Sequence, residues 1–161
     1  MQIRRYQRPD ADPCYAVFLA AVREGAARYY TAAERQAWAP HDQAPGEWAD
    51  RLGDHVAYVA ENDGQIAGFV SMTRDGHLDF AYVAPACMGQ GIASRLYHTL
   101  LADPDLVRLS KYDVQASHFS RRFLLKHGWT DAPAEKVARF DQQLTVFRMT
   151  LNRPATRSPC A

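Results

Sequence analysis

The sequence has 161 residues, and its 19 lysines and arginines nearly balance its 18 aspartates and glutamates, giving a formal net charge of +1. A chain of this length forms one domain with its own hydrophobic core. The near-neutral balance argues against nucleic acid or an acidic membrane as a partner, so we expect a small molecule or peptide. No apolar run reaches transmembrane length, and the first ten residues are polar, which predicts a cytoplasmic protein. The expected state is a monomer or a homodimer.

The three cysteines, Cys14, Cys87 and Cys160, are odd in number and widely spaced. This pattern fits neither a disulfide framework nor a zinc site, so no metal is expected. Cys87 is either a small apolar residue or a thiol activated by nearby main-chain N–H groups, and the first interpretation is favoured.

The first third of the chain predicts one strand followed by helices. Residues 2–6 alternate weakly and indicate a strand. Asp12 and Pro13 mark the start of a helix that reaches Tyr29. Thr31 and Glu34 form a capping box for a second helix over residues 31–39. Residues 41–46 form a turn-rich link, and residues 47–52 add a helical turn.

The middle of the chain predicts three antiparallel strands in succession. Residues 56–61 and 65–73 are rich in β-formers and are joined by Asn-Asp-Gly, the composition of a tight hairpin. Residues 78–83 alternate Leu78, Phe80 and Tyr82 with Asp79 and Ala81, which indicates a half-buried strand with the three bulky side chains on one face.

The last part of the chain alternates helices and strands. We expect a helix over residues 91–102, a strand over 109–115 and a helix from Ser117 to Gly128. Residues 135–140 and 144–151 form a closing hairpin that turns over residues 141–143, and residues 152–161 form a loose tail. The strands before and after helix 91–102 are joined by a βαβ crossover and should be parallel. The fold class is α/β (α+β): a mixed, mostly antiparallel sheet flanked by helices, in a single domain over residues 1–151.

The connection between the third strand and helix 91–102 carries the chemistry. Pro85 stops the strand, and Gly89, Gly91 and Ala93 leave main-chain N–H groups accessible at the start of the helix, which suits a pyrophosphate. Two alternatives are an ordinary tight connection and a Rossmann dinucleotide site with Asp113 as its acid. The Rossmann alternative fits less well, because five residues separate the strand from the first glycine.

This stretch resembles motif A of the GNAT superfamily of N-acetyltransferases, V-x-P-x-x-[QR]-G-x-G-[IL]-[GA]-x-x-L. Met88 departs from the pattern by replacing the family's Gln or Arg, whose main-chain contacts it can still provide. The segment FLLKHGW at residues 123–129 is similar to a second family segment, F-Y-x-K-x-G-[FW], with Leu124 at the tyrosine position. The matching motif A residues are Val83, Pro85, Gly89, Gly91, Ile92, Ala93 and Leu96.

The resemblance covers residues 2–151 and implies the GNAT-type acyl-CoA N-acyltransferase fold. Details such as LDFAYV and QAS at residues 115–117 are similar to a bacterial, YafP-like branch of the family. The resemblance further implies acetyl-CoA as the acetyl donor and an amine as the acceptor. The implied cofactor-binding residues are Tyr82, Val83, Met88, Gly89, Gln90, Gly91, Ile92, Ala93 and Ser94.

Acetyl transfer needs a neutral amine, so some group must accept a proton. The candidates on the third strand are Asp79, the first choice, and His77. Their alternatives are a structural salt bridge or a strand-end hydrogen bond for Asp79 and a solvated turn position for His77. We infer that a main-chain N–H near Val83 stabilises the developing oxyanion.

The family's general acid is the tyrosine that Leu124 replaces, so we expect alignment of amine and thioester to carry most of the rate. Tyr97 and Tyr112 are the nearest tyrosines in the sequence, but neither is predicted to be catalytic, and Tyr97 lies on the apolar helical stripe.

Acceptor specificity is predicted to lie in the least regular segment, because loops usually carry specificity. The family resemblance implies that the region of the first two helices covers the acceptor pocket. Tyr29, Tyr30, Trp38 and His41 would form aromatic walls for an apolar or aromatic amine, or for a cation held over rings. For Trp38, simple core packing is the alternative. The predicted function is therefore an acetyl-CoA-dependent N-acetyltransferase, and the alternative is a non-catalytic acyl-CoA-binding or regulatory module.

Overall fold

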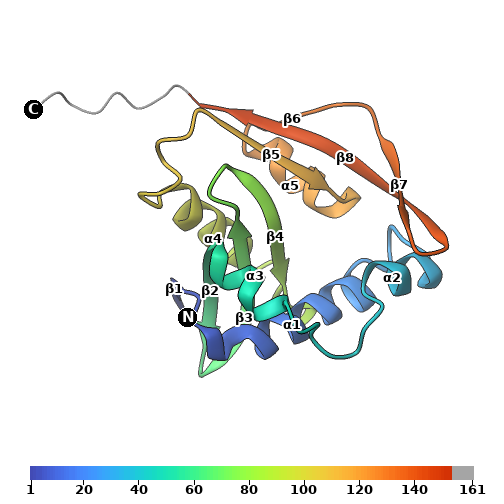
Figure 1. Cartoon of the computed structure of the whole chain (residues 1–161), viewed down its shortest axis with the longest axis horizontal. Helices are drawn as coiled ribbons and strands as arrows, with labels where there is room; N and C mark the ends of the chain where they lie inside the picture. The colour runs from blue at the N-terminus through green and yellow to red at the C-terminus, as the bar shows by residue number, and fades with distance from the viewer. Residues whose placement is uncertain (154–161) are drawn as a thin grey trace, which may run out of the picture.

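A computed structural model describes residues 1–153, so Cys160 and most of the predicted tail lie outside the described residues. Figure 1 shows a strongly twisted mixed sheet, with both β5 and β8 diverging from the first four strands. Its described strands run in the order β1-β2-β3-β4-β5-β8-β6, and β7 pairs with β8. The strands are β1 (Gln2–Arg5), β2 (Val56–Asn62), β3 (Gln65–Met72), β4 (His77–Val83), β5 (Lys111–Ala116), β6 (Thr130–Asp131), β7 (Glu135–Arg139) and β8 (Gln142–Asn152). The helices are α1 (Ala11–Ala20), α2 (Ala32–Trp38), α3 (Trp48–Asp54), α4 (Ile92–Leu101) and α5 (His118–Lys126).

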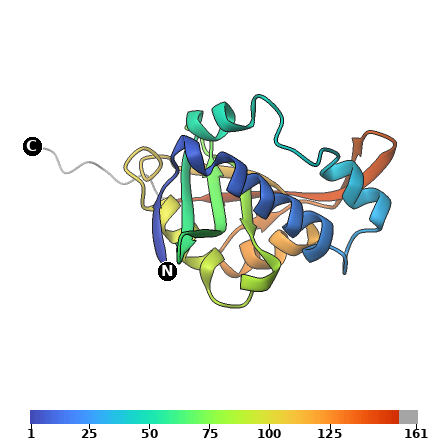
Figure 2. The ribbon, with the colours of Figure 1, turned by 90° about the horizontal axis from the view of Figure 1, so that it is seen from below.

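Helices cover both faces of the sheet, as Figure 2 shows from below. Leu96 and Leu100 of α4 and Leu124 of α5 belong to one buried cluster with residues of β2, β3, β5 and β8. Phe18 of α1 and Trp48 of α3 belong to a second buried cluster on the other face. The predicted mixed sheet with flanking helices is confirmed.

Several local predictions are confirmed. The hairpin between β2 and β3 turns at Asp63 and Gly64, both with positive φ. The Thr31 hydroxyl accepts from the Glu34 N–H at 3.2 Å, and the Glu34 carboxylate accepts from the Thr31 N–H at 2.8 Å. This is the predicted capping box at the start of α2.

The prediction that the first helix reaches Tyr29 is wrong. α1 ends at Ala20, and the π-helical turn that follows it ends at Gly25. A Cβ at Gly25 would lie 2.9 Å from the Met88 methyl carbon. The absence of a side chain at Gly25 therefore lets the loop before α4 pack directly against this turn.

The C-terminal hairpin also differs from the prediction. It turns at Phe140 and Asp141 rather than over 141–143, and Phe140 takes a φ of 51°. Strand β8 continues to Asn152, which pairs with Lys111, so the tail cannot start at residue 152. The two-residue strand β6 was not predicted, because only its pairing with β8 identifies it.

The strand β4 contains a bulge. One step along β3 spans the two steps from Leu78 to Phe80 on β4, which leaves Asp79 as the extra residue. Leu78 consequently packs in the α4 cluster, while Phe80 and Tyr82 pack in the α1 cluster. The predicted placement of the three bulky side chains on one face is wrong, because a bulge reverses the alternation.

The predicted parallel pairing of β4 with β5 is confirmed but short. It joins only His77 with Asp113 and Leu78 with Val114. Beyond these pairs the two strands separate (Figure 1), so the rest of β4 has an open edge on this side.

Candidate active site at the open edge of β4

The loop before α4 leaves space where a ligand could approach the main chain. A short 3-10 turn at Pro85–Cys87 ends the strand segment. Gly89 and Gly91 then take φ values of 77° and 76°, in the left-handed region that favours glycine. A Cβ at either position would meet no atom within 4 Å, so the space beside both glycines is open.

The main-chain N–H groups of residues 89–94 are free to bind an anion. In the described part of the chain, no hydrogen bond engages them, and the first bonded N–H of α4 is that of Arg95, which donates to the Gly91 carbonyl. Six consecutive donors at a helix N-terminus fit a phosphate or pyrophosphate. The geometry therefore fits the predicted cofactor loop.

The loop's side chains have different environments. Gly89, Gln90, Gly91 and Ala93 are exposed, whereas the Ile92 side chain is buried under α4. Ile92 can therefore contact an anion only through its main chain.

The open edge of β4 presents main-chain groups to the same region. The Ala84 N–H donates to the Ala67 carbonyl at 2.9 Å. Because hydrogen-bonding direction alternates along an antiparallel strand, the N–H groups of Ala81 and Val83 point away from β3. They face the side on which β5 has separated, and Ala81 is exposed.

The ring of Tyr82 lies on the other face of the sheet. Its centroid is 5.1 Å from that of Phe18 and 5.8 Å from that of Phe69. Burial raises the pKa of the Tyr82 phenol, so it stays neutral and able to donate a hydrogen bond.

Asp79 lies at the bulge, one residue beyond the last β4–β5 pair. Its side chain is only 11% exposed and accepts two hydrogen bonds from Arg51, from Nε at 2.8 Å and from Nη2 at 2.6 Å. His77 pairs instead with Asp113 of β5. Of the two predicted proton acceptors, Asp79 is therefore next to the open edge and His77 is at the closed end.

The two tyrosines considered for the general acid form hydrogen bonds within the core. Tyr97 accepts a hydrogen bond from the Trp129 indole at 2.8 Å, and Tyr112 donates to the Leu106 carbonyl at 2.8 Å. Both rings are buried in the α4 cluster, so Tyr97 packs in the core as its place on the apolar helical stripe predicts. Leu124 is 1% exposed in the core, so its position offers no proton donor.

Three of the four predicted acceptor-site residues come together. The Tyr30 ring lies edge-on to Trp38 at 5.3 Å, and its hydroxyl donates to the Thr145 carbonyl at 2.8 Å. Tyr29 stacks on His118 of α5 at 5.9 Å. This cluster joins the α1–α2 connection to the β5–β8 half of the molecule. His41 is exposed, and no described ring contact connects it to the cluster.

Two residues near Asp79 were missed by sequence reasoning. Arg51 is on α3, and His55 precedes β2, with its Nδ1 3.5 Å from Asp79 Oδ2 and 3.3 Å from Ser71 Oγ. Burial lowers the His55 pKa from its ordinary value of 6.5. No local motif marks either residue, because both reach Asp79 only through strand pairing and helix packing.

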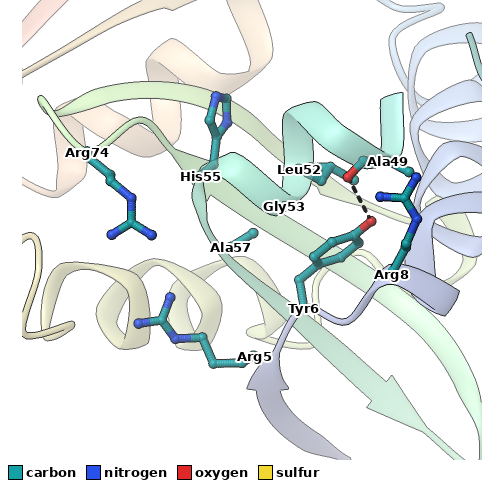
Figure 3. Close-up of a pocket in the computed structure, with 9 residues that line it drawn as sticks. All are labelled: Arg5, Tyr6, Arg8, Ala49, Leu52, Gly53, His55, Ala57 and Arg74. Carbon is teal, nitrogen blue, oxygen red and sulfur yellow. Dashed lines mark hydrogen bonds between the residues drawn. The ribbon is translucent and has the colours of Figure 1, made fainter. Parts of the chain in front are cut away.

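His55 also lines a cavity of about 250 Å³. Figure 3 shows its ring projecting from the start of β2, between Arg74 and the helix that carries Leu52. Among residues 1–153, no group of three His, Cys, Asp or Glu side chains could hold a metal ion. No helix in that range is long and apolar enough to span a membrane.

The sequence matches a known domain family over most of its length. Residues 24–152 match the family model described as Acetyltransferase (GNAT) domain. The chain is 28% identical over 137 residues to the uncharacterized N-acetyltransferase YafP of Escherichia coli K12, covering 85% of this chain and 86% of that protein. The predicted similarity to the YafP-like branch is thereby confirmed.

Solved structures share the fold. A GCN5-related N-acetyltransferase from Rhodopseudomonas palustris superimposes with a TM-score of 0.87 at 25% identity, covering 94% of this chain and 95% of that one. A PaiA N-acetyltransferase from Thermoplasma acidophilum, solved with coenzyme A, superimposes with a TM-score of 0.75 at 14% identity, covering 94% of this chain and 98% of that one. The putative acetyltransferase YncA from Salmonella typhimurium, solved with acetyl-CoA, superimposes with a TM-score of 0.67 at 20% identity, covering 99% of each chain. With the family model matching residues 24–152, this chain belongs to the GNAT family of acetyltransferases.

Proposed function

We propose that this chain is an acetyl-CoA-dependent N-acetyltransferase that transfers the acetyl group directly to a primary amine of a small molecule or peptide. The observation that carries the proposal is the run of free main-chain N–H groups at residues 89–94 beside the open edge of β4. The two relatives of the same fold that were solved with coenzyme A or acetyl-CoA support it.

The chain's own main-chain groups would hold the donor. Acetyl-CoA, when bound, supplies an acetyl group activated as a thioester. Residues 89–94 would bind its pyrophosphate, while Met88 closes the loop against Gly25 and Tyr82 lines the other face of β4. The N–H groups of Ala81 and Val83 would donate to the thioester oxygen as negative charge develops there.

Asp79 is the proposed proton acceptor for the amine. A lysine-like ammonium has an ordinary pKa of about 10.4, so a base beside the acceptor raises the reactive fraction. The two hydrogen bonds from Arg51 fix the orientation of the carboxylate. His77, held by Asp113, is the second candidate. With Leu124 in the core, alignment of amine and thioester replaces a tyrosine acid.

The proposed acceptor site is the aromatic cluster of Tyr29, Tyr30 and Trp38, with His41 on the link that follows α2. Aromatic walls suit an apolar or aromatic amine, or a cation held over rings. Packing of Trp38 against Tyr30 and Leu144 agrees with its alternative role in the core, so the exposed side of the cluster would contact the acceptor.

The test is thiol release from acetyl-CoA with a panel of amines, after calorimetry has measured acetyl-CoA binding. We expect release above the hydrolysis background with at least one amine. Asp79→Asn should lower kcat without changing the acetyl-CoA Kd. The matched control is Asp63→Asn, the same change in the distant β2–β3 turn. If acetyl-CoA does not bind, the proposal fails.

The second candidate is a non-catalytic acyl-CoA-binding or regulatory module. It is favoured by one observation, the burial of Leu124 where the resemblance places a catalytic tyrosine. Acetyl-CoA binding without thiol release from any amine would support this candidate over catalysis. Cytoplasmic location and a monomeric or homodimeric state stay predictions from the sequence.

A further inference from the structure

The environment of Asp79 limits where a proton taken from the acceptor can go. The carboxylate is 11% exposed, so its access to bulk water is restricted. Its contacts among the described side chains are Arg51 and His55. Arginine cannot give up its proton in a protein, whereas imidazole exchanges protons near neutral pH. Of these two neighbours, only His55 can take a proton from Asp79.

His55 contacts Asp79 and is also one of the residues that line a cavity. Its Nδ1 faces Asp79 and the fully buried Ser71 hydroxyl. The ring is 12% exposed, and no hydrogen bond in the described part of the chain engages Nε2. The residue is also part of the wall of the open cavity in Figure 3.

We propose that His55 relays the proton that Asp79 takes from the amine to the cavity of Figure 3, a role that rests on the proposed function. Asp79 gives the proton to His55 Nδ1, His55 releases its Nε2 proton to water, and the neutral imidazole then returns to its first tautomer. One proton passes from the acceptor to solvent, and no oxidation or reduction occurs. The distance of 3.5 Å between Asp79 Oδ2 and His55 Nδ1 is slightly longer than that of a typical hydrogen bond, and such contacts tighten when an active site is filled.

The charges around His55 are compatible with a neutral resting imidazole. Asp79 and Asp54 favour its protonated form, while Arg51 and His77 oppose it, and burial is the largest influence and lowers its pKa.

The arginines that line the cavity beside His55 already form ion pairs. Arg74 pairs with Asp105, and Arg8 pairs with Asp50. Arg5 pairs with Asp103, and Tyr6 donates to the Ala49 carbonyl. These arginines are neutralised locally, so the cavity gives a released proton a route to water without a net positive wall.

The kinetic test compares His55→Gln with the matched control His127→Gln, the same change at a partly buried histidine at the end of α5, on the full chain. Acetyl-CoA Kd should match the wild type in both variants. We expect His55→Gln to lower kcat about 10- to 100-fold, the low end of what positioned proton-transfer groups contribute. Wild-type kcat should fall at acidic pH as His55, whose pKa is lowered, becomes protonated. This acidic limb of the pH profile should be absent in His55→Gln and retained in His127→Gln.

Two further measurements distinguish a relay from a structural role. Exogenous imidazole should restore turnover to His55→Ala, because the adjacent cavity can admit it, and should not restore Asp79→Asn. In an NMR titration without substrate, the His55 pKa should fall in Asp79→Asn, since a neighbouring carboxylate favours the imidazolium.

The outcomes separate the relay from the proposed function. If the wild type binds acetyl-CoA but turns over no amine, both the proposed function and the relay are overturned. If the wild type turns over and His55→Gln keeps its rate and acidic limb, the relay alone is overturned. A reduced rate that imidazole does not restore, with an unchanged pH profile, likewise rejects the relay in favour of a structural role.

Discussion

Replacing Gly91 by glutamate or by glutamine separates the electrostatic role of the cofactor loop from its backbone strain. Gly91 caps α4 with a φ of 76°, and a Cβ there would meet no atom within 4 Å. A non-glycine residue in this conformation costs about 1–2 kcal/mol. Both variants carry this cost, so their unfolding free energies in urea should be lowered equally.

The charge should act only on binding. A carboxylate about 4 Å from a phosphate charge is repelled by about 1 kcal/mol in water and about 4 kcal/mol near a protein surface. Gly91→Glu should therefore bind acetyl-CoA about 5-fold to 10³-fold more weakly than Gly91→Gln in calorimetry, and added salt should narrow the difference. Acetyl-CoA at 100 times its Kd should stabilise the wild type by about 2.7 kcal/mol, and at the same concentration it should stabilise Gly91→Glu less than Gly91→Gln. Equal affinities for the two variants, with circular dichroism showing both folded, would refute the placement of the pyrophosphate.

Three other changes test the packing around the site. Leu124→Tyr places a hydroxyl in the core, so it should lower the unfolding free energy by about 1–3 kcal/mol and should not increase thiol release. A more active variant would contradict the assignment of this position to the core. Gly68→Ala puts a Cβ 2.9 Å from the Tyr82 carbonyl oxygen, so urea denaturation should show an unfolding free energy lowered by about 1–3 kcal/mol, and calorimetry should show a weaker acetyl-CoA affinity. Unchanged binding would show that this part of β4 does not shape the site. Burial lowers the pKa of His55, so below about pH 6.5 the unfolded chain binds more protons than the folded one, and the unfolding free energy falls as the pH drops. Urea titrations between about pH 7.5 and 5 should show a smaller fall in unfolding free energy for His55→Gln than for the wild type. Parallel curves for the two proteins would mean that the His55 pKa is not lowered.

The parts of this protein that the sequence predicted are those whose physical cause is local. Gly89 and Gly91 are two residues apart, and their freedom at positive φ acts on the adjacent N–H groups, so the loop could be inferred from the sequence alone. The capping box of α2 and the hairpin at Asp63 and Gly64 are local for the same reason.

The arrangement around Asp79 was decided by the tertiary structure. The bulge on β4 depends on its register with β3, and that register reverses the face taken by Phe80. Arg51 and His55 are 28 and 24 positions away from Asp79 in the chain, and they reach it only after α3 has packed against the sheet. The sequence by itself therefore determined the family and the loop for the anionic donor, since both depend on neighbouring residues. Which groups surround the proposed proton acceptor depended on contacts between distant segments, which no periodicity or spacing encodes.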